Sequence, residues 1–212
     1  MLSSAAVKEV FARFKRLNPE PKCELNYSSD YTLLVAIVLS AQTTDKNVNK
    51  ATPALFAVAD TPEKMLALGE ERLKTYIRSI GLFNNKAKSI IALSKDLVEK
   101  FGGKIPADFD TLQTLAGVGR KTANVVMSTA FHIPAIAVDT HVFRVSNRLG
   151  LVDAPDVLKT EMQLRALIPQ DRWSDAHHWL IFHGRRVCKA QHPLCAECTL
   201  RPWCRKYNSE TE

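Results

Sequence analysis

Long apolar runs, low-complexity linkers and internal repeats are all missing from this sequence. The longest apolar segment, Tyr31–Leu39, has about half of the roughly 20 residues that a membrane-spanning helix needs, so we interpret it as a buried core helix. Residues 1–22 also lack the apolar stretch and the small-residue cleavage site of a secretory signal. These absences argue against a secreted or membrane-spanning protein and favour an intracellular one.

The N-terminal segment is predicted to form an amphipathic helix. Its apolar residues recur at helical spacing, at Val7, Val10, Phe11, Phe14 and Leu17. A mitochondrial presequence is the alternative interpretation, and the acidic Glu9 and the regular spacing argue against it.

Strand-like alternation of apolar and polar residues is also missing. Ala135–Val138 could be extended, but it is too isolated to build a sheet. Helical signals recur instead: Ser28–Asp30 offers an N-cap, and Thr61–Glu63 combines a cap, a proline in the first turn and an acid. An apolar stripe along Lys86–Phe101 is stopped by Gly102–Gly103. The predicted fold class is all-α.

Basic residues outnumber acidic ones in this sequence, and most of its cysteines are clustered in one segment. Lys and Arg number 29 against 22 Asp and Glu, and the formal net charge of +7 favours a polyanionic partner, nucleic acid before a membrane surface. Four of the five cysteines, Cys188, Cys195, Cys198 and Cys204, fall within residues 188–204, whereas Cys23 stands alone. In a chain without an export signal, such a cluster is typical of metal ligands rather than of disulfides.

The most informative stretch is a glycine turn between two predicted helices. Asp108 or Asp110 is expected to cap a short helix, Gly117 and Gly119 then make a tight turn, and residues 122–131 resume a helix. Such a turn leaves backbone N–H groups unpaired at the positive end of a helix dipole. Those donors suit a phosphate group.

Two cations, Arg120 and Lys121, follow the turn directly and add positive charge at the same place. The alternative interpretation is an ordinary tight turn between packed helices, with two solvated cations. The glycine spacing alone does not decide between these interpretations. With the flanking Leu115, Val118 and Lys121–Ala123 the string resembles the helix-hairpin-helix of DNA glycosylases, and this resemblance favours DNA binding.

Several segments resemble the endonuclease III family of DNA glycosylase/AP lyases, which belongs to the helix-hairpin-helix superfamily. These segments are Leu39–Gln42, Gly117–Val126, Val138–Val145 and the C-terminal cysteines. The resemblance is collinear from about Asn26 to Tyr207. This chain has Ala116 where the family usually has a proline, which would stiffen the hairpin.

The resemblance implies two helical lobes with a DNA-binding cleft between them. Residues 23–133 would form the lobe with the helix-hairpin-helix, and residues 1–22 plus 134–212 would form a lobe with a 4Fe-4S cluster. The implied partner is double-stranded DNA that contains damaged pyrimidines or abasic sites, bound by a monomer. In a bacterium the protein would then be cytoplasmic and associated with the nucleoid.

The resemblance also implies a nucleophile, Lys121, and an assisting carboxylate, Asp139. A free lysine amine has a pKa of about 10.4, so only about one amine in a thousand is neutral near pH 7.4. Attack on C1′ of the sugar needs the neutral amine, which desolvation by bound DNA and a neighbouring cation would favour. The resulting Schiff base would cleave the strand by β-elimination.

An ionised Asp139 favours the ammonium form of a nearby lysine, so we expect it to stabilise positive charge developing on the sugar and to accept a proton. The alternative role is structural, because an aspartate just before Val142 and Phe143 is typical of an N-cap. One carboxylate can serve both roles.

The cysteine spacing, with six, two and five residues between successive cysteines, fits either a structural zinc site or an iron–sulfur cluster. Only Cys195 and Cys198 form the short pair that zinc sites usually repeat. The resemblance implies the 4Fe-4S cluster, with Cys188, Cys195, Cys198 and Cys204 as its ligands.

DNA contacts are expected from three sets of residues. The resemblance places Gln42 and Leu82 at positions that fill the gap left by an extruded base. The hairpin, through Gly117, Val118, Gly119 and Arg120, would hold a phosphate. Arg186, Lys189 and Arg205, which flank the cysteines, would contact further phosphates. The alternative for Gln42 is a polar helix C-terminus, and for Leu82 a small satellite core.

Two rival functions remain at this point. An adenine-mismatch glycosylase of the same superfamily shares the hairpin and the cluster, but it typically lacks the nucleophilic lysine and carries an extra C-terminal domain. A non-catalytic DNA-binding module would use only the hairpin and the basic loop. Lys121 and the chain end at Glu212 argue against the first, and the presence of both Lys121 and Asp139 argues against the second.

Overall fold

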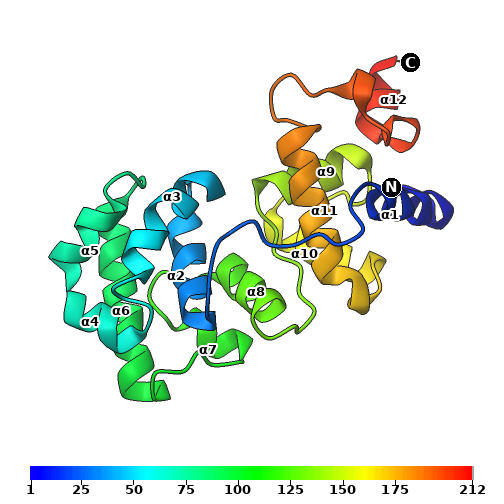
Figure 1. Cartoon of the computed structure of the whole chain (residues 1–212). Helices are drawn as coiled ribbons and strands as arrows, with labels where there is room; N and C mark the ends of the chain where they lie inside the picture. Colours follow the sequence, from blue (N-terminus) through cyan, green and yellow to red (C-terminus); the bar gives the residue numbers. More distant parts are fainter. Residues whose placement is uncertain (212) are drawn as a thin grey trace. The chain divides into compact units, whose positions relative to one another are not determined.

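The computed structural model describes residues 1–211, and this part of the chain contains helices and no strand (Figure 1). The all-α prediction is therefore confirmed. The chain divides into two compact units: unit 1 comprises Met1–Cys23 and Pro134–Glu212, and unit 2 comprises Glu24–Ile133. Cys23, which the sequence-based division assigned to the other lobe, falls in unit 1.

Unit 2 is built around helix α2 (Asp30–Ser40), which is buried at every position from Tyr31 to Leu39. A helix that is apolar on all sides must be surrounded, and α2 contacts α3, α6 and α8. The core-helix interpretation of Tyr31–Leu39 is confirmed. The other helices of the unit are α3 (Asp45–Phe56), α4 (Pro62–Leu68), α5 (Glu70–Ile77), α6 (Phe83–Phe101), α7 (Phe109–Gln113) and α8 (Arg120–Thr129).

The helix ends of unit 2 follow the caps in the sequence. Ser29 caps α2 in a capping box with Thr32. Thr61 caps α4, with Pro62 in its first turn. Gly102, with φ 58°, ends α6 in the left-handed conformation that glycine adopts at low cost. Helix α6 begins at Phe83, three residues before the apolar stripe predicted its start.

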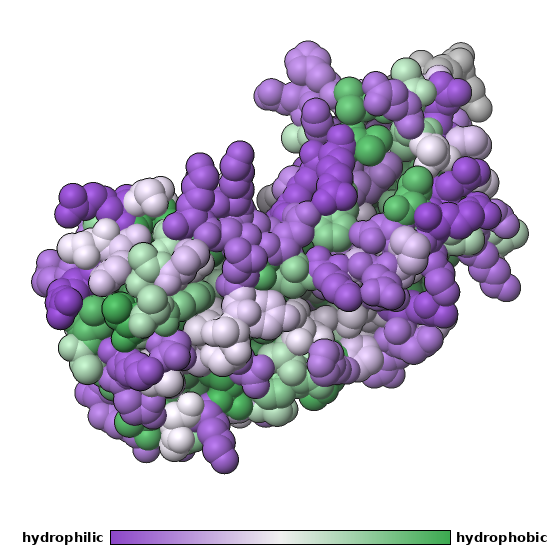
Figure 2. Space-filling model, in the orientation of Figure 1, coloured by the Kyte–Doolittle hydropathy of each residue, from purple (hydrophilic) through white to green (hydrophobic). Residues whose placement is uncertain are grey.

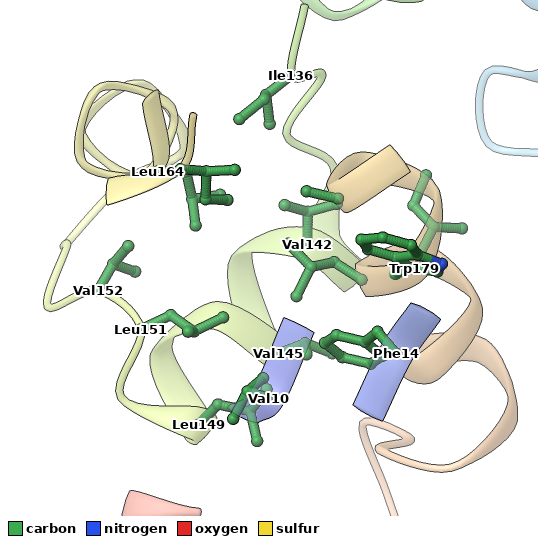
Figure 3. Packing of buried hydrophobic residues seen from close by; sticks show 14 of the residues in the cluster. Val10, Phe14, Ile136, Val142, Val145, Leu149, Leu151, Val152, Leu164 and Trp179 are labelled. Atoms are coloured by element: carbon green, nitrogen blue, oxygen red, sulfur yellow. The ribbon is translucent and has the colours of Figure 1, made fainter. Parts of the chain in front are cut away.

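Unit 1 packs its helices around one apolar core. Figure 3 shows Val10 and Phe14 of α1 facing Val142 and Val145 of α9 and Trp179 of α11. The helices of the unit are α1 (Ser4–Leu17), α9 (Thr140–Leu149), α10 (Val157–Leu167), the 3-10 turn η1 (Gln170–Arg172), α11 (Trp173–Arg186), the 3-10 turns η2 (Cys195–Glu197) and η3 (Arg201–Trp203), and α12 (Arg205–Thr211).

Helix α1 is tied into unit 1 by specific contacts as well as by burial. The Phe14 ring stacks on Trp179 with ring centroids 6.3 Å apart, and the Trp179 indole donates to the Asn18 carbonyl at 2.8 Å. Leu17 was expected on the same apolar face, but it is 60% exposed. That expectation was wrong for Leu17 alone, which is the last residue of α1, whereas Val7, Val10 and Phe14 are buried.

Hydrophilic residues predominate on the face of the molecule shown in Figure 2, and the hydrophobic ones form small separate patches there. No helix within residues 1–211 is long and apolar enough to cross a membrane.

Candidate active site and nucleic-acid interface

The glycine turn joins α7 to α8 as a helix-hairpin-helix. Asp108 caps α7, because its carboxylate accepts a hydrogen bond from the Thr111 amide at 2.7 Å. Of the two predicted caps, Asp108 and Asp110, the first is therefore confirmed. Helix α8 differs, because its N-cap is Gly119, which has no side chain and makes no side-chain cap hydrogen bond. The N-cap residue of α8 therefore contributes no side-chain oxygen that would compete with an anion at this helix end.

Gly117 is required at the tip of the hairpin for two reasons. Its φ of 78° lies in the left-handed region, and a Cβ there would lie 2.9 Å from the Ser89 Cβ of α6. Any other residue would be strained and would push the hairpin away from α6. Leu115 and Val118 are buried on either side, so the turn is anchored into unit 2.

Arg120 and Lys121 open α8, and both side chains are exposed. The Arg120 guanidinium lies over the Phe109 ring of α7, 5.2 Å from its centroid, which orients it by a cation–π interaction. The Lys121 amine is solvated in this structure. A bound substrate must therefore supply the desolvation that favours a neutral nucleophile.

Asp139 is the N-cap of α9 in unit 1. Its Oδ1 atom accepts from the His141 and Val142 amides, both at 2.8 Å. The structural role weighed for this residue is thus confirmed. Its Oδ2 atom accepts no hydrogen bond from any residue in 1–211, and the residue is only half-buried. Capping uses one oxygen and leaves the other for chemistry.

Arg144, one turn along α9, fixes the surroundings of Asp139. Its guanidinium donates to the carbonyls of Gly184 at 2.9 Å and Cys188 at 3.1 Å, and it lies 3.1 Å from His141 Nδ1. Burial lowers the pKa of the Arg144 guanidinium below its ordinary value. This side chain joins the start of α9 to the end of α11 and the first cysteine.

The turns that carry Gln42 and Leu82 lie next to each other in unit 2. Gln42 follows α2 with φ 56°, and Leu82 precedes α6 with φ 60°. Leu82 is 55% exposed, so the satellite-core alternative is wrong. Thr43 Oγ1 lies 3.9 Å from the place that a Cβ on Gly81 would occupy, which brings the two turns into contact.

The four clustered cysteines lie on one loop, residues 187–204, which we call the cysteine loop. None of them forms a disulfide. Burial raises the pKa of the Cys198 and Cys204 thiols, and the charges of Cys188 and Cys195 raise both further, so the four sulfurs are electrostatic neighbours. The Arg148 guanidinium approaches Cys188 Sγ at 3.7 Å and donates to the Lys189 carbonyl at 2.7 Å.

The spacing of these sulfurs bears on the choice of metal. Four thiolates on one zinc ion lie about 3.8 Å apart, because each Zn–S bond is about 2.3 Å long. Within residues 1–211 no three His, Cys, Asp or Glu side chains are grouped as ligands for a single metal ion. A 4Fe-4S cluster binds each thiolate through a different iron, so its ligands stand further apart. Four clustered thiolates can serve as ligands for either a zinc ion or a 4Fe-4S cluster.

The basic residues near the cysteine loop differ in what they contact. Lys189 is exposed. The Arg186 guanidinium lies over the Phe182 ring, 4.8 Å from its centroid. The Arg205 guanidinium donates to the Asn147 carbonyl at 2.9 Å and pairs with Asp153 at 3.2 Å, so two of its five N–H donors hold the start of α12.

Sequence reasoning brought together the hairpin residues and the four cysteines, and it missed Arg144, Arg148 and Lys86. Arg144 and Arg148 stand four residues apart on one face of α9, which is a signal that could have indicated a shared partner. Lys86 was read only as the start of an apolar stripe.

The hairpin, the N-terminus of α8 without a side-chain cap, and Arg120 and Lys121 directly after it define a DNA-binding protein of the helix-hairpin-helix class. The family model described as HhH-GPD superfamily base excision DNA repair protein matches residues 35–170. The chain is 53% identical to endonuclease III of Rickettsia conorii over 209 residues, covering 97% of this chain and 98% of the relative. It is 48% identical to endonuclease III of Escherichia coli over 203 residues, covering 96% of each.

A solved structure of a trapped endonuclease III–DNA covalent intermediate superposes on the whole chain with a TM-score of 0.95, at 46% identity and with both chains fully covered. The chain therefore belongs to the endonuclease III family of base excision DNA repair enzymes.

Proposed function

We propose that the protein excises oxidised pyrimidines from duplex DNA and cleaves the strand 3′ to the abasic site, as a bifunctional DNA glycosylase/AP lyase. The observation that carries the proposal is Lys121, an exposed amine in the first turn of α8, directly after the hairpin. The similar endonuclease III structure is a covalent intermediate with DNA, which requires a protein nucleophile.

Lys121 accounts for both activities in one sequence of bonds. Its Nζ attacks C1′ of the damaged nucleotide, and the N–C1′ bond forms as the glycosidic bond breaks and the base leaves with the bonding electrons. Loss of an amine proton and opening of the sugar ring give an iminium between Nζ and C1′. The iminium acidifies the C2′ proton, and removal of that proton expels the 3′ phosphate by β-elimination.

Asp139 assists through the oxygen that capping leaves unused. Its Oδ1 is fixed by two amides, so the carboxylate cannot rotate freely and Oδ2 has a defined direction. A fixed negative charge stabilises positive charge that develops on the sugar, and the same oxygen accepts a proton during the later steps.

Phosphate contacts hold the DNA, and the side chains of Gln42 and Leu82 open the duplex. The amides of Gly117 and Gly119 and the Arg120 side chain take one phosphate, while Lys189 and Arg186 take others. Val118, predicted among these contacts, instead donates its amide to the Leu115 carbonyl at 3.1 Å and anchors the turn. Arg205 can contact a phosphate only through the guanidinium N–H groups that are not bonded to Asn147 or Asp153. Gln42 and Leu82 enter the duplex where the base leaves. One copy of the chain supplies every group named, so we propose that it acts as a monomer.

Cys188, Cys195, Cys198 and Cys204 would hold a 4Fe-4S cluster, in keeping with their clustering on one loop, their freedom from disulfides and the family to which the chain belongs. The cluster would supply structural cross-linking of the cysteine loop. The chain's own residues then hold Lys189 and Arg186 in position beside it, because Arg148 fixes the Lys189 backbone.

The experiment is incision of a duplex that contains a single thymine glycol, with borohydride present to trap any Schiff base. The proposal predicts base release, a nick and a covalent protein–DNA adduct. Incision confined to a mismatched adenine, without an adduct, would instead indicate an adenine-mismatch glycosylase. Tight binding with neither incision nor adduct would indicate a non-catalytic module.

A further inference from the structure

Lys86 is a buried lysine that the proposed chemistry does not use. The residue lies in the first turns of α6 and is 6% exposed. Its Nζ donates to the Leu39 carbonyl at 2.9 Å and to Thr43 Oγ1 at 3.2 Å. Burial lowers the pKa of the ammonium, which shows that the amine has given up solvation to reach these acceptors.

The two acceptors flank Gln42. Leu39 lies in the last turn of α2, where carbonyl groups lack intrahelical partners and a cation is stabilised by the helix dipole. The last turn of α2 contains no basic residue of its own. Lys86 therefore provides, from another helix, the cation that this turn lacks.

The backbone of Lys86 is joined to the second turn. Its amide donates to the Leu82 carbonyl at 3.0 Å, closing the first turn of α6. The Lys86 side chain thus holds the turn of Gln42 through Thr43 Oγ1, and its main chain holds the turn of Leu82, so one residue ties both turns together.

Both turns are strained at the residue that each presents. Gln42 and Leu82 are exposed non-glycine residues in the left-handed backbone region, which L-residues rarely adopt. Such a backbone persists only where surrounding contacts fix it. The Lys86 contacts with Leu39, Thr43 and Leu82 are contacts of this kind.

The same helix also touches the hairpin. Ser89, one turn beyond Lys86, is the side chain against which Gly117 packs. Helix α6 therefore connects the two turns to the segment that precedes Lys121.

We propose that Lys86 is a positioning residue for base extrusion, which holds Gln42 and Leu82 at a fixed separation so that they enter the duplex as a pair. This inference rests on the proposed function, because it concerns the step that delivers the damaged nucleotide to Lys121. Lys86 touches neither substrate nor the reacting atoms, and it acts through the two turns.

Three variants of the full-length protein with its cluster test the proposal. Lys86→Met keeps the length of the side chain but cannot donate a hydrogen bond. Thr43→Val removes one acceptor and leaves the Leu39 carbonyl in place. Lys88→Met, at an exposed lysine of the same helix, removes the same charge without touching either turn and serves as the matched control.

Two substrates separate extrusion from chemistry. An abasic site in duplex DNA requires extrusion, whereas an abasic site in a single strand does not. We expect Lys86→Met to slow borohydride trapping on the duplex by about 10- to 100-fold, in line with the effect of small misplacements, while trapping on the single strand stays at the wild-type rate. Thr43→Val should lie between, and Lys88→Met should match the wild type on both.

A fluorescent 2-aminopurine opposite the abasic site provides a second readout, because insertion of Gln42 and Leu82 changes its stacking. The proposal predicts a slower fluorescence change for Lys86→Met with unchanged binding to undamaged duplex. Equal slowing on both substrates, or wild-type rates on both, would overturn it. Failure of the wild-type protein to trap the abasic duplex would instead overturn the proposed function.

Discussion

The capping and catalytic roles of Asp139 can be separated by two substitutions at the same position. Asp139→Ala removes both acceptor contacts, with the amides of His141 and Val142, each 2.8 Å long. Loss of an aspartate cap costs about 0.5–2 kcal/mol, and loss of a negative charge at a helix N-terminus costs about 0.3–1 kcal/mol. We expect the free energy of unfolding to fall by about 1.5 kcal/mol, which lowers Tm by about 3–6 °C in a chain of this size.

Asp139→Asn should behave differently, because asparagine caps a helix about as well as aspartate does. The amide oxygen can accept from the same two backbone amides, so Tm should stay within about 2 °C of the wild-type value. The negative charge is lost, and with it the stabilisation of charge on the sugar and the proton acceptor. Single-turnover incision should fall by about 10²- to 10⁴-fold, the usual contribution of such a group.

Asp156 supplies the matched control, since it caps α10 by accepting from the Lys159 amide at 2.8 Å and has no proposed part in the chemistry. Asp156→Ala should lower Tm and leave incision unchanged. Calorimetry and a quenched incision assay on the three variants decide the matter. Near-normal incision by Asp139→Asn would refute the catalytic role, and a fall in Tm as large as that of Asp139→Ala would refute the cap.

Three other substitutions test separate parts of the account. Cys198→Ser should remove the visible absorption of an iron–sulfur cluster and lower both Tm and DNA affinity. Cys23→Ser, the control, should keep the absorption. A colourless wild-type protein that contains zinc would contradict the proposed cofactor. Lys189→Ala should weaken binding to damaged and undamaged duplexes alike and lower the salt slope by about 0.9, and a change in lesion preference alone would contradict a phosphate contact. The Thr111 side chain and backbone hold the pKa of Asp108 below its ordinary value of 3.8, so the stability it contributes is present above that pH and is lost as pH falls through the lowered value. We therefore expect the wild type to be more stable than Asp108→Asn at neutral pH and to lose this difference at low pH, as measured by denaturation midpoints. A stability difference that does not change with pH would contradict this prediction.

The parts of the fold that could be predicted are those fixed by local chemistry. The buried run Tyr31–Leu39 is apolar on all sides, so only a central helix accommodates it. Asp108 and Asp139 stand two or three residues before the amides that they cap, and Thr61 with Pro62 marks the start of α4. Each of these signals lies within one turn of the chain.

The parts that could not be predicted depend on contacts between distant segments. Lys86 meets Leu39 and Thr43 across more than forty residues, and nothing in the sequence near Lys86 indicates burial. Arg205 was expected to meet phosphate, but its partners Asn147 and Asp153 come from a segment that the chain brings back only in the folded state. Leu17 fitted the helical spacing, and only the end of α1 shows why it is exposed.

Borohydride trapping by Lys121→Gln tests the central claim most directly. The substitution removes the nucleophile but leaves the hairpin amides and Arg120, so binding to an abasic duplex should weaken by only about 1 kcal/mol while covalent trapping disappears. Arg120→Gln, at the adjacent cation, should weaken binding similarly and still form the adduct. If Lys121→Gln protein forms the adduct at the wild-type rate, another amine is the nucleophile and the assignment of Lys121 is wrong.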